Sequence, residues 1–270
     1  MKFDRSKFSE ITQLAIEAAI QSGKLLKQGY STQFEVSYKP GKHNLVTEYD
    51  IASEKQILSL IRETYPDHNF LCEEEGVIQS DTEGGIKWII DPLDGTVNFA
   101  HNIPVFAVSI AVFKDNEPFC GVVYAPMYEE LFVGEKSKGA FLNGEKISVT
   151  KIQNLEDSFL STGFPYNMHE NPHHIIERFG SFIKKGIPIR RLGSATLDLT
   201  YVAAGRFDGY WETGLGAWDC AAALVIIQEA GGKVSNWDGS DFKLADKNNT
   251  ILATNGHIHE EMVQQLKDML

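Results

Sequence analysis

One segment, WIIDPLDGTVNF at residues 88–99, limits how this chain can fold. The three apolar residues before Asp91 have the character of a buried strand end. Pro92 fixes φ and has no N–H to donate, and Gly95 permits a sharp change of direction. The segment therefore predicts a rigid corner after a strand, followed by a short helical turn. It presents the carboxylates of Asp91 and Asp94 three residues apart.

Hard carboxylate oxygens beside a helix N-terminus form a place where Mg²⁺ and a phosphate can bind together. Spacing excludes two other acidic motifs. An EF-hand loop counted from Asp91 would need oxygen ligands where Leu93 and Gly95 stand and a glutamate where Asn102 stands. Phosphatases that form an aspartyl-phosphate place their two aspartates closer together than this chain does. We therefore expect both carboxylates to hold metal while water attacks the phosphate.

Composition indicates a globular protein whose principal partner is a small molecule. The 270 residues suit one large domain or two ordinary ones, with 43% hydrophobic and 23% charged residues. The net charge of −12 argues against nucleic acid or an anionic membrane as partner. Three cysteines without a CxxC pair argue against disulfides and zinc. With no apolar signal core and no run of about 18 apolar residues, the expected location is the cytoplasm.

Periodicity divides the chain into two halves. In residues 1–145, apolar spacing over 8–26 and a capping-box pattern at 47–50 predict two helices. Alternating segments there predict antiparallel strands at 105–113, 119–124 and 131–134. Residues 146–270 alternate between strands and helices, which predicts a mixed α/β layer. Those strands are expected at 159–163, 187–192, 207–211 and 251–254, and the helices at 172–184, 194–204, 218–230 and 257–269. A ligand cleft is expected between the halves.

Acidic side chains recur at the ends of these elements, at Asp50, at Glu73–Glu75, at Asp91 with Asp94, and at Asp219. Each has an ordinary explanation when taken alone. Asp50 can cap a helix, a run of glutamates is commonly a solvated face, and an aspartate in a first helical turn gains about 0.3–1 kcal/mol from the helix dipole. The combination of all four clusters favours a shared metal site.

The same segments resemble the inositol monophosphatase family of Mg²⁺-dependent, lithium-sensitive phosphatases. The most specific are WIIDPLDGTVNF at 88–99 and WDCAAALVIIQEAGG at 218–232, and NLVTEYD at 44–50 and FLCEEEG at 70–76 support them in order and spacing. One departure lies at residues 72–75, where Cys-Glu-Glu-Glu replaces the family's common Gly-Glu-Glu-Ser and makes the surroundings more acidic. The resemblance implies an αβαβα sandwich of the sugar-phosphatase type, antiparallel in the first half and mixed α/β in the second, and a homodimer.

The resemblance also implies how metal is held. A first Mg²⁺ would be held by Glu73, Asp91 and the carbonyl of Leu93. Asp91 would bridge to a second Mg²⁺, completed by Asp94 and Asp219. Carboxylates about 4 Å apart repel by roughly 4 kcal/mol per pair at an effective dielectric near 20, so such a cluster needs cations.

The catalytic residues implied by the resemblance surround the same corner. A third, weaker ion would lie near Glu73 and, through water, Asp50. Thr96 and Asp50 would take or relay the proton of the attacking water. The backbone N–H groups of Gly95 and Thr96 would bind the phosphate at the helix start.

Substrate specificity is expected from the second half. Glu212, at the end of FDGYWE, matches the family's acceptor for inositol hydroxyls, and Asp94 would accept from them too. The family's other substrate-contacting backbone matches Gly193, Ser194 and Ala195. Each of these positions can instead be structural. Lys39 or Lys42 can approach a phosphate from its Pro- and Gly-containing loop, or can be solvated.

The predicted function is Mg²⁺-dependent hydrolysis of myo-inositol monophosphate to inositol and phosphate. Two ions about 3.5–4 Å apart can activate a water and stabilise the departing alkoxide in an in-line displacement. The same chemistry on the 2′-phosphate of NADP, fructose 1,6-bisphosphate or a 3′-phosphoadenosine nucleotide stays open, although Glu212 favours a small polyol. A regulatory binding protein with a secondary phosphatase site is the other alternative, since some bacterial relatives are known for partners in RNA synthesis.

Overall fold

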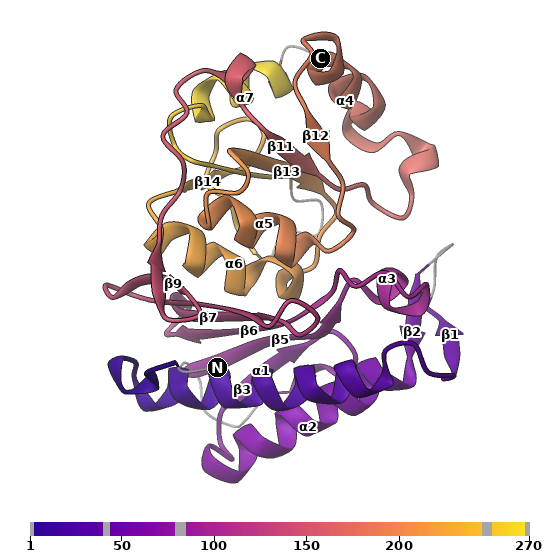
Figure 1. The fold of residues 1–270 in the computed structure, drawn as a ribbon, viewed down its shortest axis with the longest axis vertical. Coiled ribbons are helices and arrows are strands. Elements are labelled where there is room, and N and C mark those ends of the chain that lie inside the picture. Colours follow the sequence, from indigo (N-terminus) through magenta and orange to yellow (C-terminus); the bar gives the residue numbers. More distant parts are fainter. Residues whose placement is uncertain (1–2, 40–43, 79–84, 245–249, 268–270) are drawn as a thin grey trace.

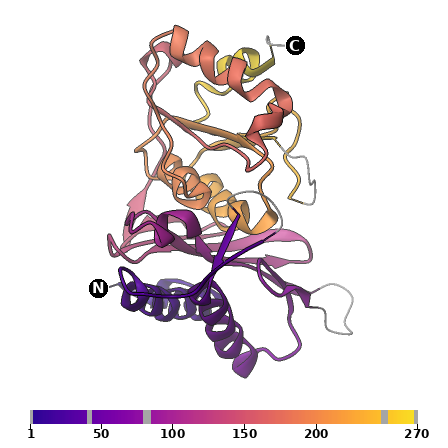
Figure 2. The ribbon, with the colours of Figure 1, turned by 90° about the vertical axis from the view of Figure 1, so that its right-hand side faces the viewer.

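The computed structural model describes residues 3–39, 44–78, 85–244 and 250–267, and these residues form alternating layers of helices and sheets (Figure 1). One outer layer contains α1 (Glu10–Gly29) and α2 (Glu48–Thr64), and the other contains α4 (Ile175–Lys184) and α7 (His259–Lys267). Between the two sheets lie α5 (Ala195–Ala203) and α6 (Ala217–Glu229). In the view turned by 90°, the two outer layers again lie at opposite ends of the molecule (Figure 2). The arrangement confirms the predicted αβαβα sandwich.

The first sheet has eight strands within the described residues, in the order β10-β9-β8-β7-β6-β5-β3-β4. Their bounds are β3 (Asn69–Cys72), β4 (Gly76–Ile78), β5 (Ile86–Asp94), β6 (Ala107–Lys114), β7 (Glu117–Ala125), β8 (Glu130–Glu135), β9 (Gly139–Leu142) and β10 (Glu145–Ile147). The pairs are antiparallel, as predicted, apart from β3 and β5, which run parallel. Parallel pairing places the carboxyl ends of β3 and β5 side by side. Glu73 and Asp91 therefore emerge at the same place.

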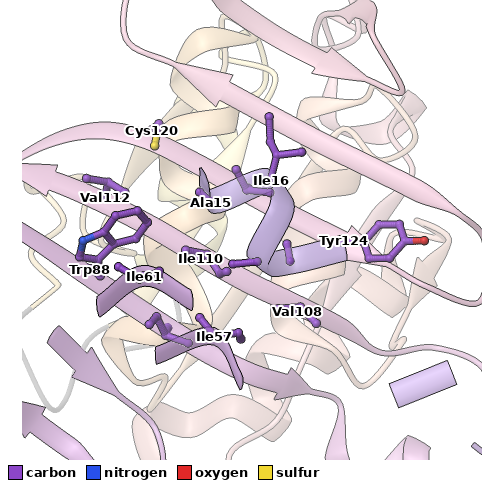
Figure 3. Close-up of a cluster of buried hydrophobic side chains, with 14 of the residues drawn as sticks. Ala15, Ile16, Ile57, Ile61, Trp88, Val108, Ile110, Val112, Cys120 and Tyr124 are labelled. Atoms are coloured by element: carbon purple, nitrogen blue, oxygen red, sulfur yellow. The ribbon is translucent and has the colours of Figure 1, made fainter. Parts of the chain in front are cut away.

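Both faces of the first sheet are buried, so its central strands are almost continuously apolar. Trp88 and Ile110 pack toward Ile16 and Ile57 of α1 and α2, as the close-up of this cluster shows (Figure 3). The residues that alternate with these two along β5 and β6 point to the opposite face of the sheet, toward α6. Gly121 of β7 lies directly beneath α6, since a Cβ added there would lie 2.1 Å from a helix carbonyl oxygen. The helix is thereby fixed against the sheet.

The second sheet has five described strands in the order β12-β11-β13-β15-β14. Their bounds are β11 (Leu160–Thr162), β12 (Ile189–Arg190), β13 (Gly209–Thr213), β14 (Lys233–Ser235) and β15 (Thr250–Thr254). β11 pairs in parallel with β12 and β13, whereas β15 is antiparallel to its neighbours. The sheet is therefore mixed, as predicted. Tyr210 faces the inner helices, and Trp211 faces the outer layer.

Several local features differ from the expectations. The helix expected from residue 172 begins at Ile175, because Asn171, His173 and His174 have positive φ and residues 172–174 form a 3₁₀ turn. β1 (Val36–Tyr38) and β2 (Leu45–Thr47) form an unpredicted antiparallel pair. The boundary expected after residue 145 falls inside β10, and the two-part division stays a prediction. Further short helices are α3 (Thr96–Ala100) and 3₁₀ turns at Arg5–Lys7, Leu155–Asp157 and Met168–Glu170.

A helix suited to crossing a bilayer, in length and apolar character, does not occur among the described residues.

Candidate functional site

The corner predicted from WIIDPLDGTVNF lies at the end of β5. Asp91 pairs with Ser109 and Asp94 with Ala107, so β5 contains one extra residue relative to β6. The Leu93 N–H donates to Asp91 Oδ1 at 3.0 Å, which fixes the first carboxylate within the bulge. Gly95 follows at φ 95°, where a Cβ would lie 2.8 Å from a backbone carbonyl, and α3 begins at the next residue. The bulge and the glycine together direct both aspartates toward α6.

Three carboxylates converge at this corner. Asp91, Asp94 and Asp219 each offer an oxygen, and these atoms lie within 4.8 Å of one another. Asp219 lies in the first turn of α6, where it accepts the Gly216 N–H at 2.7 Å. The structure therefore brings together residues that are 128 positions apart in the chain, counted from Asp91 to Asp219.

Asp94 is held by the start of α5. Its Oδ2 accepts the Ser194 hydroxyl at 2.5 Å and the Thr196 N–H at 2.8 Å. The Thr196 hydroxyl in turn donates to the backbone carbonyl of Asp219 at 2.9 Å. These contacts connect α5, α6 and the β5 corner around one point, so the positions of the carboxylates depend on each other.

Glu73 faces Asp91, and its charge contributes to the raised pKa of that aspartate. In this structure Glu73 is paired with Lys39, whose Nζ lies 2.8 Å from Glu73 Oε1 and 2.6 Å from Glu74 Oε1. Lys39 is thus an ion-pair partner of the predicted ligand, whereas Lys42 lies outside the described residues. The ordinary interpretation of the glutamate run as a solvated face is wrong for the first two of its residues.

Glu54 of α2 was not found from the sequence, although it lies one helical turn after Asp50. It is buried, and its carboxylate accepts the N–H groups of Glu74 at 2.9 Å and Glu75 at 2.8 Å. Burial raises the pKa of Glu54, while these N–H groups oppose the rise. Its contacts fix the turn that follows β3, and with it the backbone that carries Glu73.

Asp50 and Thr96 form a hydrogen-bonded pair beside the acidic cluster. Asp50 closes a capping box on α2, since its Oδ2 accepts the Thr47 N–H at 2.7 Å and the Thr47 hydroxyl at 2.6 Å. Its Oδ1 lies 2.8 Å from the Thr96 hydroxyl, which is also 3.0 Å from the Leu93 carbonyl. Asp50 therefore caps its helix and also faces the site.

Electrostatics at the corner favour a bound cation. Burial, reinforced by neighbouring carboxylates, raises the pKa values of Asp91 and Asp219 well above their ordinary range. Burial raises the pKa of Asp94 to about 6, against the hydrogen bonds it accepts, and that of Asp50 to about 7. Converging hard oxygens that cannot all ionise unaided fit a hard divalent cation such as Mg²⁺.

A cavity of about 480 Å³ extends from this cluster toward the second sheet. Glu212 of β13 borders its far side; Glu212 Oε2 accepts the Tyr210 hydroxyl, and burial raises the pKa of Glu212 to about 7. A Cβ at Gly163 would lie 2.0 Å from the Glu212 carboxylate, so a side chain at position 163 would displace that carboxylate. The predicted substrate-contacting residues line the same cavity: Asp94, Gly95, Thr96, Gly193, Ser194, Ala195 and Glu212.

Four further cavity residues were not found from the sequence. Asp198 of α5 is buried in the cavity wall, and Tyr166 and Met168 are exposed and also border the cavity. Arg191 is the one cationic side chain among the described lining residues. It follows Arg190 directly, and two adjacent arginines in a sequence are commonly solvated, so only the fold shows that Arg191 borders the cavity.

The five-layer sandwich, with carboxylates that meet at the end of a bulged strand beside a polar cavity, has the sugar-phosphatase type of fold, and the class of protein it indicates is a phosphatase. The chain belongs to the inositol monophosphatase family, whose sequence model matches residues 7–270. It is 40% identical over 258 residues to the Nus factor SuhB of Haemophilus influenzae (95% of this chain, 96% of that one). It is 39% identical to the inositol-1-monophosphatase of Caulobacter vibrioides (93% and 99%). The crystal structure of the extragenic suppressor protein suhB from Bartonella henselae superposes with a TM-score of 0.91 at 37% identity (97% and 100%).

Proposed function

We propose that the protein hydrolyses the phosphate ester of a small polyol, myo-inositol monophosphate, with the aid of Mg²⁺. One observation carries the proposal: Asp91, Asp94 and Asp219 converge within 4.8 Å at one end of a cavity whose other end presents Glu212. The first end suits cations and a phosphate, and the second suits hydroxyl groups. A curated relative bears the name inositol-1-monophosphatase.

The residues that would hold Mg²⁺ are Glu73, Asp91, Asp94, Asp219 and the carbonyl of Leu93. Bound there, divalent ions would supply the positive charge that activates a water and stabilises the transferring phosphoryl group and the leaving oxygen. The side chains are already fixed by the bulge, by Ser194 and by the start of α6. The three aspartates then need little reorganisation on binding, whereas Glu73 must first part from Lys39.

Proton transfer would fall to Thr96 and Asp50. A threonine hydroxyl has one proton, so Thr96 can donate it to Asp50 while its own lone pair accepts the proton of an attacking water. Burial raises the pKa of Asp50 to about 7, a value suited to a general base at neutral pH. The hydrogen bond between these two side chains, 2.8 Å long, supports the relay.

Recognition of the polyol would fall to the far side of the cavity. Tyr210 engages Glu212 Oε2, which leaves Oε1 as an acceptor for substrate hydroxyls. The segment from Gly193 to Ala195 borders the same space. It is held in place by Asn98, whose side-chain amide donates to the carbonyls of Leu192 and Gly193.

The test is a substrate panel with pure protein. Inositol 1-phosphate, NADP, fructose 1,6-bisphosphate and a 3′-phosphoadenosine nucleotide are compared by kcat/KM at several Mg²⁺ concentrations. We expect Mg²⁺-dependent phosphate release with inositol 1-phosphate preferred, inhibition by lithium, and loss of activity by orders of magnitude in Asp91→Asn with folding retained. Absence of phosphate release from inositol 1-phosphate, or full activity of Asp91→Asn, would contradict the proposal.

One observation favours a nucleotide as second candidate substrate. Tyr166 and Met168 border the cavity and are 55% and 54% exposed, so they offer an apolar contact that a polyol does not need. A base could pack there while its sugar phosphate reaches the carboxylates. Preference for the nucleotide in the panel, reduced by Tyr166→Ala, would select this candidate.

The name Nus factor SuhB, borne by a relative at 40% identity, favours a further candidate: a role as a binding partner in which phosphatase activity is secondary. A pull-down whose partners are indifferent to Asp91→Asn, yet lost on surface substitution, would support it. We also propose that the protein is a homodimer, as the resemblance implies, and that it is located in the cytoplasm, as the apolar pattern of the sequence favours. Light scattering tests the dimer.

A further inference from the structure

Asp198 is a buried carboxylate that the proposed chemistry does not use. It lies in α5, where nearly every residue is buried, and is 1% exposed. Its Oδ1 has no hydrogen-bond partner within the described part of the chain. A buried carboxyl group with an unpartnered oxygen is costly, and an apolar side chain of similar size would avoid that cost. Packing alone therefore does not account for this residue.

The surroundings of Asp198 connect it to Glu212. Ser161 of β11 pairs with Tyr210 of β13, and Glu212 follows two residues later on the same face of that strand. This face packs Tyr210 into the same core as the apolar residues of α5, and the buried Asp198, Tyr210 and Glu212 lie close enough to influence one another's pKa values. The Tyr210 hydroxyl donates to Glu212 Oε2, and both Asp198 and Glu212 border the cavity.

The charges in this cluster are mutually dependent. Burial and the charge of Glu212 raise the pKa of Asp198 well above its ordinary range. Burial, with both carboxylates nearby, likewise raises the pKa of Tyr210. Two adjacent buried carboxyl groups do not both ionise readily. A neutral Asp198 leaves the single negative charge on Glu212, next to the cavity.

We propose that Asp198 is a positioning residue for Glu212: together with Tyr210 it keeps that carboxylate turned toward the cavity, and so selects substrates whose leaving group bears hydroxyls. The inference rests on the proposed function, because it takes Glu212 as the acceptor for those hydroxyls. It assigns Asp198 no contact with the phosphate or with the metal ligands.

Two substitutions separate positioning from packing. Asp198→Asn keeps the shape and a neutral polar group, whereas Asp198→Leu keeps the branching at Cγ, with a larger volume, and removes the polar group. For inositol 1-phosphate, we expect Asp198→Leu to raise KM by about tenfold with kcat within about twofold, and Asp198→Asn to stay within about threefold of the parent protein. Both variants should hydrolyse p-nitrophenyl phosphate, whose leaving group has no aliphatic hydroxyls, with unchanged kcat and KM.

A double-mutant cycle then tests whether Asp198 acts through Glu212. In a Glu212→Gln background, Asp198→Leu should lower kcat/KM for inositol 1-phosphate by no more than about a further twofold. Tyr210→Phe, which removes only the donor to Glu212, should reproduce the rise in KM and serves as the second loss variant if Asp198→Leu does not fold.

The inference is overturned if the fold-losses in kcat/KM caused by Asp198→Leu and Glu212→Gln multiply in the double variant. It is also overturned if Asp198→Leu lowers kcat/KM equally for inositol 1-phosphate and p-nitrophenyl phosphate, or if Asp198→Asn is as impaired as Asp198→Leu. Parent protein that is inactive on inositol 1-phosphate overturns the proposed function and the inference together. If the parent protein is active and both Asp198→Leu and Tyr210→Phe have its KM for inositol 1-phosphate, the inference is overturned and the proposed function stands.

Discussion

The Thr96 hydroxyl lies 2.8 Å from Asp50 Oδ1, which joins the first turn of α3 to the first turn of α2 across 46 positions of sequence. The same hydroxyl is 3.0 Å from the Leu93 carbonyl, beside the carboxylate cluster. A hydroxyl between the buried Asp50 carboxylate and the proposed metal ligands is well placed to transfer a proton, and this geometry leads to the first prediction.

Thr96→Ala should lower kcat by about 10²-fold or more with little change in KM, because positioned proton transfer commonly contributes 10²–10⁴-fold. Thr96→Ser, which keeps the hydroxyl, is the matched control and should retain most activity. Burial raises the pKa of Asp50 to about 7, so kcat should rise with pH up to about that value as the base deprotonates. Steady-state pH profiles check this, and a rising limb that persists in Asp50→Asn would refute it.

The acidic cluster should make metal-free protein lose stability as pH rises. The pKa values of Asp91 and Asp219 are raised in the folded state by burial, so folded protein binds more protons than unfolded protein at intermediate pH. The stabilising protonation is complete at low pH and is lost as the pH rises through the pKa values that these two groups have in the folded protein. Saturating Mg²⁺ should therefore raise Tm by about 5 °C or more at pH 8, and by less at pH 5.5. Thermal scans with EDTA or Mg²⁺ test this, with Asp94→Asn as the variant expected to reduce the Mg²⁺ effect.

Lys39 should compete with cations for Glu73. Its ammonium lies 2.8 Å from Glu73 Oε1 and must withdraw before an ion can bind that oxygen. Lys39→Ala should therefore bind Mn²⁺ or Mg²⁺ about three- to tenfold more tightly without substrate, whereas Lys39→Arg should resemble the parent protein. Calorimetric titration measures this directly. Weaker cation binding by Lys39→Ala would show that the lysine supports the site instead.

His259 should make the protein sensitive to mild acid. Its Nε2 lies 2.9 Å from the Ser235 hydroxyl and its Nδ1 lies 2.9 Å from the Thr254 hydroxyl, and burial lowers its pKa to about 4. A histidine whose pKa is lower in the folded protein than in the unfolded protein stabilises the fold fully at pH values above its unfolded pKa of about 6.5. This stabilisation decreases as the pH falls toward 4. The loss should reach about 2–3 kcal/mol in the free energy of unfolding.

Denaturant unfolding between pH 7.5 and pH 4, on the parent protein and on His259→Gln, isolates this contribution from the carboxylates. The glutamine variant should lose the part of the pH dependence that lies between about 6.5 and 4. Identical pH dependence in the two proteins would exclude His259 as its source.

Local sequence signals predicted the elements near the site. The corner could be predicted because Pro92 and Gly95 restrict the backbone between Asp91 and Asp94 to few conformations. The helix from Glu48 could be predicted because its capping box is contained within four residues. Such features depend on neighbours in the chain and not on the rest of the fold.

Features that depend on long-range packing were missed. The parallel pairing of β3 with β5 is set by a crossover that periodicity does not report. Asp198 and Glu54 look like ordinary polar helix positions in the sequence, and only the stacked layers show that both are buried. The Lys39–Glu73 ion pair likewise joins segments whose proximity follows from the β1–β2 pair and the end of β3.

The absence of side chains at Gly121 and Gly134 lets α6 lie directly against β7 and β8, and the same helix carries Asp219 at its opening turn. An added methyl group at Gly121 would displace α6 from the sheet and move the carboxylate of Asp219 away from those of Asp91 and Asp94. We therefore expect the affinity of the proposed cation site to depend on how closely α6 packs against the first sheet. Substitutions in the middle of the sandwich, remote from any atom that meets the substrate, would then alter the site through the position of α6 alone.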